Sequence, residues 1–332
     1  MTGLDLVAIT DRSGHDESFH FGAVVALGAD GSIELAVGDP GIEIYARSAN
    51  KPLQAVAMVR AGLDLPPEQL ALVCASHSGT PRHLDGVRRV LASAGLDEHA
   101  LCNTPDFPLH APSMRDVVRA GGGRTALQMN CSGKHAGMLV TAQCRGWETD
   151  ESYLDREHPV QRAIDDVVVE LTGSPFVHVG VDGCGSPAHV TTLLGLACAF
   201  RAIALAPDGS AEQQVFRAMA SHPYEVGGPA RPVTTLMERI PGLMAKDGAE
   251  GVFAAALPDG RAVALKIADG GDRARPVVMA AALASVGVDV SAAADVWHVA
   301  TLGHGHPVGA VRAADALAVH LPSGLAAPRS PA

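Results

Sequence analysis

A serine and a lysine stand three residues apart in the stretch RSANKPLQ, as Ser48 and Lys51. Residues at this spacing share one face of a helix, so their side chains can meet. Pro52 fits only in a first helical turn, which places Ser48 at or just before a helix N-terminus, where backbone N–H groups are free. A serine in this position can attack a carbonyl carbon if the lysine amine takes its proton. The alternative is structural: Ser48 caps the helix and Lys51 is solvated.

A second group of reactive side chains lies in NCSGKH and VDGC. Cys131, Lys134 and His135 gather a thiol, an amine and an imidazole within about one helical turn, and Asp182 and Cys184 follow later. Two thiolates and a nitrogen ligand suit zinc, with a water or substrate atom in the fourth position. Lysine is an unusual ligand because it must lose its proton, which the charge of the metal can drive. The alternative is two buried, inert cysteines beside a hydrogen-bonded histidine.

One motif matches the dinucleotide-binding fingerprint in its residue spacing alone. Gly183, Gly185 and Ala188 form a G-x-G-x-x-A pattern between a strand-like and a helix-like run. A dinucleotide site also requires an acidic residue at the end of a second strand about 20 residues later, and the sequence shows none. We therefore expect no dinucleotide at this motif.

Composition narrows the class of protein. The chain has 332 residues, 47% hydrophobic and 18% charged, which is typical of a globular protein with an ample core. Its net charge of −11 and 4% aromatic residues argue against nucleic-acid binding. The most apolar runs, 190–200 and 276–288, are too short to span a membrane, and the N-terminus lacks the basic-then-apolar layout of a signal peptide. We expect a cytoplasmic protein that binds neither nucleic acid nor membrane.

The elements that must position these groups follow from periodicity and turn residues. Residues 6–39 alternate as an antiparallel meander around a Gly-Ala-Asp-Gly turn. Apolar periodicity predicts helices over 48–61, 159–171 and 187–204, a strand over 176–183, and two strands within 242–270 joined by the turn LPDGRA. Strands at both chain ends with helices between them predict an α/β (α+β) fold, in which one antiparallel sheet packs against helices and a helical lobe. The predicted single domain is 1–320, with its sheet from about 1–45 and 231–320, its lobe from about 46–230, and a flexible tail at 321–332.

Five motifs, in the order RSANKPLQ, CASHSGTPRH, NCSGKHAG, GVDGCGSP and KDGAEGV, resemble the asparaginase II family, the Rhizobium-type L-asparaginases. The resemblance covers nearly the whole chain. It implies a fold similar to serine β-lactamases and glutaminases, hydrolysis of L-asparagine to aspartate and ammonia, and a homodimer.

The resemblance also implies catalytic residues. Ser48 and Lys51 match the family's S-x-x-K pair, with Ser48 as the nucleophile. Ser76 matches the second active-site serine, and Lys246 stands in the place of the lysine that pairs with it. Lys266 is the alternative for this lysine if the strands are aligned differently.

The remaining implied residues bind metal and substrate. The implied zinc ligands are Cys131, Lys134 and Cys184, and the implied substrate-binding residues are Arg47, His135 and Asp182. We expect about one Zn²⁺ per chain with a positioning role, because a serine with its own base needs no metal-bound hydroxide. The chain departs from the family pattern at Thr80, where the family often carries an acid.

Two other functions remain open at this point. A β-lactamase or penicillin-binding hydrolase would use the same Ser-x-x-Lys pair, although such enzymes act outside the cytoplasm. A non-catalytic zinc-binding protein would use Cys131 and Cys184 but would not need two pairs of serine and lysine.

Overall fold

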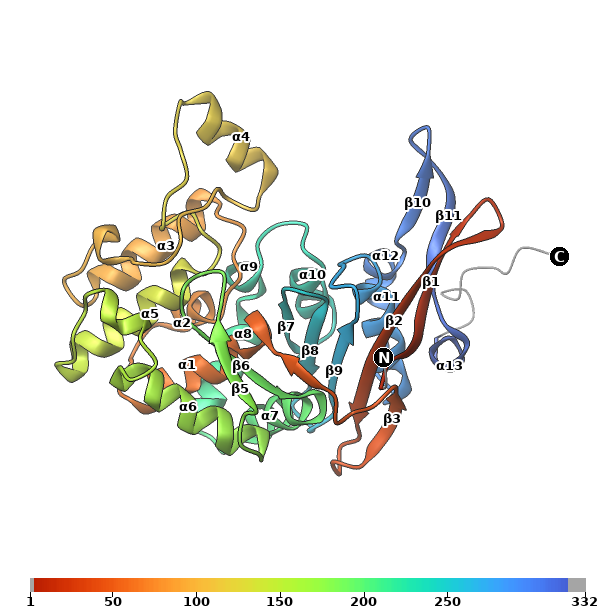
Figure 1. Cartoon of the computed structure of the whole chain (residues 1–332), viewed down its shortest axis with the longest axis horizontal. Coiled ribbons are helices and arrows are strands. Elements are labelled where there is room, and N and C mark those ends of the chain that lie inside the picture. The colour runs from red at the N-terminus through yellow and green to blue at the C-terminus, as the bar shows by residue number, and fades with distance from the viewer. Residues whose placement is uncertain (1–2, 322–332) are drawn as a thin grey trace.

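The main sheet is assembled from both ends of the chain. The structure is a computed structural model that describes residues 3–321. The strands follow the order β10-β11-β1-β2-β9-β8-β7, with β3 paired to β2, and all pairs are antiparallel (Figure 1). Their bounds are β1 Asp5–Arg12, β2 His15–Leu27, β3 Ile33–Val37, β7 Met244–Gly248, β8 Val252–Ala256, β9 Ala262–Ile267, β10 Ala300–Gly303 and β11 His306–Ala313. The predicted α/β architecture is thereby confirmed.

Helices cover both faces of the central strands. Helix α7 (Leu193–Leu205) packs against β9, β8 and β2, and α11 (Arg275–Ser285) packs against β9, β2 and β1. Strand β8 is accordingly buried at every position, which explains its continuous apolar sequence VFAAA. Burial on two sides gives the strands next to the helical lobe a rigid setting.

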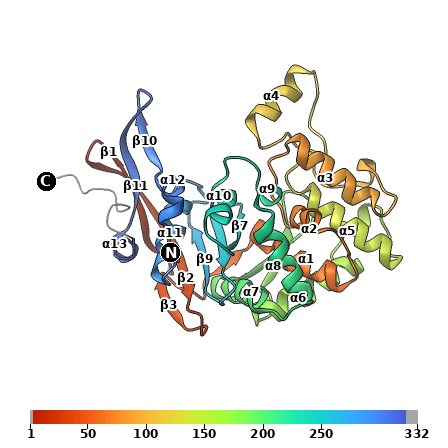
Figure 2. The same ribbon diagram turned by 180° about the vertical axis from the view of Figure 1, so that it is seen from behind.

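The helical lobe lies beside the β7 edge of the sheet, as the views from both sides show (Figures 1 and 2). Its elements are η1 Arg47–Asn50, α1 Lys51–Arg60, α2 Pro67–Val73, α3 Pro81–Ala92, η2 Glu98–Ala100, α4 Ala111–Arg119, α5 Ser132–Arg145, η3 Glu151–Leu154, α6 Pro159–Thr172, α8 Ala211–Ser221 and α9 Pro223–Val226. Helix α10 (Pro232–Arg239) follows the lobe, and η4 (Ser291–Ala293), α12 (Ala294–Trp297) and α13 (Asp315–Ala318) lie near the chain's end. Proline opens many of these helices, because a first turn needs no intrahelical N–H.

The helix predicted over 187–204 is wrong in its first six residues. Residues Pro187–Thr192 form strand β6, which pairs with β4 (Glu43–Tyr45) and β5 (His178–Val181) in a small sheet within the lobe. Thr192 then caps α7 by accepting a hydrogen bond from the Gly195 N–H. The β-branched run Val190, Thr191, Thr192 favours an extended backbone, and the cap at Thr192 fixes where the helix begins.

Residues 242–270 hold three strands and not the predicted two. Strand β7 ends at Gly248, and a turn through Glu250 and Gly251 leads into β8. Gly251 has a φ of +73°, a left-handed conformation that glycine adopts without strain. The extra turn makes β7 the last strand of the sheet and places Lys246 on it, next to η1.

Among residues 3–321, no helix is long and apolar enough to cross a membrane. The tail predicted at 321–332 lies outside the described residues except for Leu321.

Candidate active site

The N-terminal end of α1 carries the first serine and lysine. Ser48 lies in the single turn η1, Lys51 opens α1, and Pro52 occupies its first turn, as predicted. Neither η1 nor α1 has a side-chain cap, and Lys51 is only 2% exposed. The alternative of a capping serine with a solvated lysine is therefore wrong.

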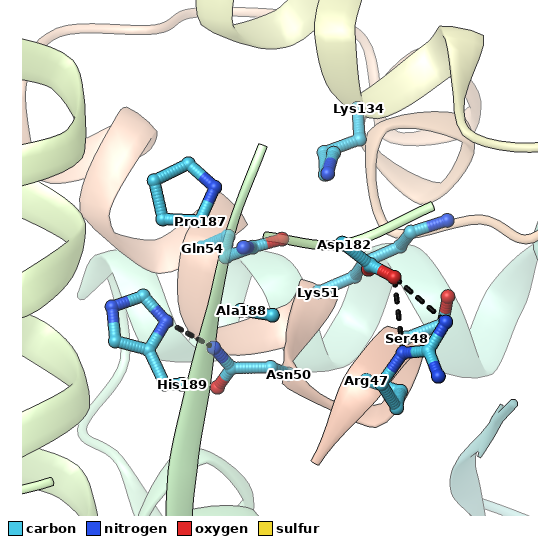
Figure 3. A pocket seen from close by; sticks show the side chains of 10 residues that line it. All are labelled: Arg47, Ser48, Asn50, Lys51, Gln54, Lys134, Asp182, Pro187, Ala188 and His189. Atoms are coloured by element: carbon cyan, nitrogen blue, oxygen red, sulfur yellow. Dashed lines mark hydrogen bonds and ion pairs between the residues drawn. The ribbon is translucent and has the colours of Figure 1, made fainter. Parts of the chain in front are cut away.

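The Lys51 amine connects three parts of the lobe. Its Nζ donates to Ala75 O at 2.5 Å, to Ser76 Oγ at 3.2 Å and to Cys131 Sγ at 3.1 Å. The amine therefore lies among three acceptors that come from two other segments of the chain. Within residues 3–321, no hydrogen bond joins Lys51 to the Ser48 hydroxyl, although both side chains line the same pocket (Figure 3). The direct contact of Lys51 is with the second serine.

An ion pair lines this pocket. Arg47 Nε and Nη2 lie 3.0 and 2.8 Å from Asp182 Oδ1 (Figure 3), and the same oxygen accepts a hydrogen bond from the Gly183 N–H at 2.7 Å. Arg47 has a φ of +50°, a left-handed conformation that costs a non-glycine residue about 1–3 kcal/mol. The pocket has a volume of about 10 Å³, room for roughly one water. An amino acid therefore fits only if side chains that line the pocket move.

The thiols and amine of the predicted metal site lie close to one another, and Lys134 lines the same pocket as the Arg47–Asp182 pair (Figure 3). Lys134 Nζ lies 3.1 Å from Cys184 Sγ and also donates to Ser186 Oγ. Its interaction with Cys131, together with the charge of Lys134, holds the pKa of Cys184 far below its usual value. The interaction with Cys184, together with burial, raises the pKa of Cys131, whose thiol donates to Asn130 Oδ1 at 3.0 Å. Burial lowers the pKa of Lys134, but its electrostatic interactions with Cys184 and Cys131 outweigh burial, so the net shift is upward. Lys134 and Cys184 are thus in direct, buried contact.

His135 completes the cluster. Its Nδ1 lies 2.8 Å from the hydroxyl of the buried Tyr153, which accepts a hydrogen bond from the Cys102 N–H. Burial and the charge of Lys134 lower the pKa of His135 to about 4, so the ring is neutral at pH 7. Its other nitrogen, Nε2, is buried without a hydrogen-bond partner. An unpaired buried nitrogen beside two thiols indicates a place for a further ligand.

The donor set fits a zinc ion. Among residues 3–321, no three His, Cys, Asp or Glu side chains gather as a metal cluster, so a zinc site at Cys131 and Cys184 would need a donor of another kind, such as the Lys134 amine. Cys131 and Cys184 supply the soft sulfur ligands that zinc prefers. The ion would replace the positive charge that Lys134 now provides to the thiolate.

Lys246 lies on β7, fully buried, with its Nζ donating to Asp247 O at 2.6 Å and to Asp247 Oδ1 at 2.8 Å. The predicted pairing of Ser76 with Lys246 is not formed, because Ser76 contacts Lys51 and Lys246 contacts Asp247. Burial lowers the pKa of Lys246 to about 8, and the charge of Lys51 adds to this effect. Lys266 lies on β9, half-buried, and donates to Glu250 O. Between the two lysines, Lys246 is the one whose charge interacts with Lys51.

Two polar groups near the site, His189 and Asp165, carried no sequence signal. His189, on β6, lines the pocket and bonds Asn50 of η1 at 3.3 Å (Figure 3), and it also bonds Asp165 of α6 at 2.7 Å. These contacts fix the turn that carries Ser48. They join residues 24 and 139 positions apart, and no motif marks them.

Serines beside buried lysine amines, within a mixed α/β fold, are the features of a hydrolase. The family model of L-asparaginase II matches residues 8–313, and the chain belongs to this family. None of the curated protein sequences matches the chain.

Solved structures resemble the chain only distantly. A structure of Mglu in its native form has 14% identity and a TM-score of 0.44, covering 80% of this chain and 63% of that chain. A beta-lactamase from Mycobacterium bovis has 17% identity and a TM-score of 0.38, covering 80% and 95%. EstCE1, described as a hydrolase with promiscuous acyltransferase activity, has 12% identity and a TM-score of 0.40, covering 80% and 93%.

Proposed function

We propose that the protein is an L-asparaginase that hydrolyses the side-chain amide of L-asparagine through a serine ester. The observation that carries this proposal is the Arg47–Asp182 ion pair beside Ser48, together with membership of the L-asparaginase II family. Asparagine carries an ammonium and a carboxylate on one carbon. When the pair opens, Asp182 can accept the ammonium and Arg47 the carboxylate, which directs the side-chain amide toward Ser48.

Ser48 attacks the amide carbon, and its proton passes to Lys51, which must be a neutral amine at this step. Ser76, whose Oγ lies 3.2 Å from Lys51 Nζ, supports a relay between the two serines and the amine. The proton then goes to the departing nitrogen, ammonia leaves, and a β-aspartyl ester remains on Ser48. Water hydrolyses the ester, and Lys51 takes and returns the proton in the same way.

The oxyanion of the tetrahedral intermediate requires two N–H donors. The candidates are the N–H groups of Ser48 and Ala249. Close packing of β7 against η1 supports this pairing, because a Cβ on Gly248 would lie 2.9 Å from Ala46 O and 3.2 Å from Ala49 N. Glycine at this position lets the strand approach the turn that holds Ser48.

Zinc would be held by Cys131, Lys134 and Cys184. When bound, it supplies a Lewis acid that orients polar groups of the substrate. We propose a positioning role, because the nucleophile is a serine with its own base. His135 keeps its neutral ring against Tyr153 and offers Nε2 to the substrate side of the cluster.

The homodimer and the cytoplasmic location are also proposals. The family resemblance supports the dimer, and light scattering of the purified protein tests it. Imaging of a tagged chain tests the location.

Ammonia release from L-asparagine tests the proposed function. We expect release by the wild type, nearly complete loss in Ser48→Ala, and wild-type rates in Ser285→Ala, a matched control whose hydroxyl bonds Ala282 O on α11. A loss in Ser76→Ala with a substantial rate left in Ser48→Ala would assign the nucleophile to Ser76. Absence of release from asparagine, with turnover of another amide, would reject the substrate.

A further inference from the structure

The chain contains only four lysines, Lys51, Lys134, Lys246 and Lys266, and the first three are at most 2% exposed. A buried ammonium group is costly unless acceptors replace the water it loses. The acceptors of Lys51 and Lys134 are groups of the site that lie on other elements. Lys246 instead depends on the residue next to it.

The two carboxylate oxygens of Asp247 contact two different cations. One oxygen, Oδ1, lies 2.8 Å from Lys246 Nζ, and the other, Oδ2, lies 2.6 Å from Arg231 Nη2. Asp247 is 7% exposed and Arg231 is 25% exposed, so the pair is partly shielded from water. Arg275 ties the strand down beside them by donating to Gly248 O at 2.6 Å.

Few charged groups act on Lys246. Asp247, on its own strand, favours the charged amine, whereas Lys51 of α1 and Arg231, just before α10, oppose it. Cys74, which follows α2, also lies within reach of the Lys246 charge. Because Arg231 neutralises part of the Asp247 charge, Asp247 cannot fully offset burial.

We propose that Asp247 and Arg231 are positioning residues for Lys246: Asp247 holds the amine in the site through one carboxylate oxygen, and Arg231 holds the other oxygen and limits the charge that the amine feels. This proposal rests on the proposed function only in taking Lys246 as part of the active site. The arrangement itself makes predictions that need no turnover.

The two residues act on the pKa of Lys246 in opposite directions. Asp247→Asn keeps the shape but removes the charge that favours the ammonium form, so the pKa of Lys246 falls from about 8 by roughly 1–3 pH units. Arg231→Ala removes one of the two arginine charges that act on Asp247, so the carboxylate attracts the Lys246 ammonium more strongly and the pKa of Lys246 rises. Loss of packing alone would not produce shifts of opposite sign.

NMR of the protein with ¹⁵N-labelled lysine side chains measures this directly, because only four amine signals exist and Lys246→Arg identifies one of them. We expect a lower pKa in Asp247→Asn, a higher pKa in Arg231→Ala, and a value close to wild type in Arg231→Lys. Arg217→Ala, which removes an exposed arginine paired with Asp208, is the matched control and leaves the pKa unchanged. If Asp247→Asn does not fold, the two Arg231 variants still show whether the charge of Arg231 lowers the pKa of Lys246.

A cavity of about 380 Å³ lined by Arg231, Asp247, Phe253 and Arg275 permits a second test. Guanidinium ion at low millimolar concentration can occupy the space that Arg231→Ala leaves, so we expect it to return the Lys246 pKa toward the wild-type value. The part of the pH–rate profile that reports the ionisation of Lys246 should shift back by the same amount. Guanidinium should change neither property in Arg217→Ala.

Shifts of the same sign in the Asp247 and Arg231 variants, or an unchanged Lys246 pKa in both, would overturn the proposal. Because the NMR titration is independent of turnover, a protein inactive on asparagine but showing the opposite shifts would reject the proposed function and keep this inference.

Discussion

Replacing Asp182 by asparagine tests how the site recognises its substrate. The change keeps the shape of the side chain and an oxygen for the Gly183 N–H, but removes the charge that pairs with Arg47. If Asp182 binds the α-ammonium group, the substitution removes one charge-assisted hydrogen bond, worth about 1.5–3 kcal/mol. Because the proposed binding of the ammonium group requires the Arg47–Asp182 pair to open, we take the lower half of this range. At 1.4 kcal/mol per factor of ten, kcat/KM on asparagine should fall roughly 10- to 40-fold.

The assay compares two substrates in two proteins. Succinamic acid carries the same terminal amide and carboxylate as asparagine but lacks the α-amino group. The wild type should hydrolyse it less efficiently than asparagine, by a factor similar to the loss caused by Asp182→Asn. The variant should act on succinamic acid at close to the wild-type kcat/KM, so its preference for asparagine disappears.

Equal losses on asparagine and succinamic acid would refute this reasoning. That result would mean that Asp182 serves the fold, or holds Arg47, and does not contact the amino group. Thermal unfolding of both proteins controls for a general loss of structure.

Three further predictions concern the nucleophile, the metal and the packing. Ser48→Ala and Lys51→Met should each remove nearly all kcat, and the double variant should be little worse than either single variant, because the two residues act as a unit; additive losses would contradict this. Metal analysis of the purified protein should find about one zinc per chain. The zinc content should fall in Cys131→Ser, and also on acidification as the thiolates and Lys134 take up protons. Absence of zinc from the wild type, or an unchanged zinc content in the variant, would return the cysteines to a structural role. Gly133→Ala should lower the free energy of unfolding by about 1–3 kcal/mol, because the new Cβ would lie 2.3 Å from Leu72 O. Gly123→Ala, whose new Cβ would have nothing within 4 Å, should leave the free energy of unfolding unchanged. Chemical denaturation measures both variants, and equal stability would show that α5 can shift to make room.

Local chemistry predicted much of this protein. Pro52 in a first turn placed Ser48 and Lys51 at the start of a helix, and the structure has them there. Strand-like runs at both chain ends predicted the antiparallel sheet, because apolar alternation and turn residues act within a few neighbours. The same local reasoning failed at Pro187–Thr192, where pairing with β4 and β5 overrides the apolar periodicity.

The sequence by itself indicated which groups are proposed to carry the chemistry: two serines, two cysteines and the lysines, in motifs that each span a few residues. Only the tertiary structure decided which groups meet. Lys51 reaches Ser76 and Cys131, which are 25 and 80 positions away, whereas Lys246 contacts Asp247, whose other oxygen binds Arg231. Long side chains can reach several partners, and the packing of α1, α5 and β7 selects among them, because a buried amine must lie where acceptors replace its water.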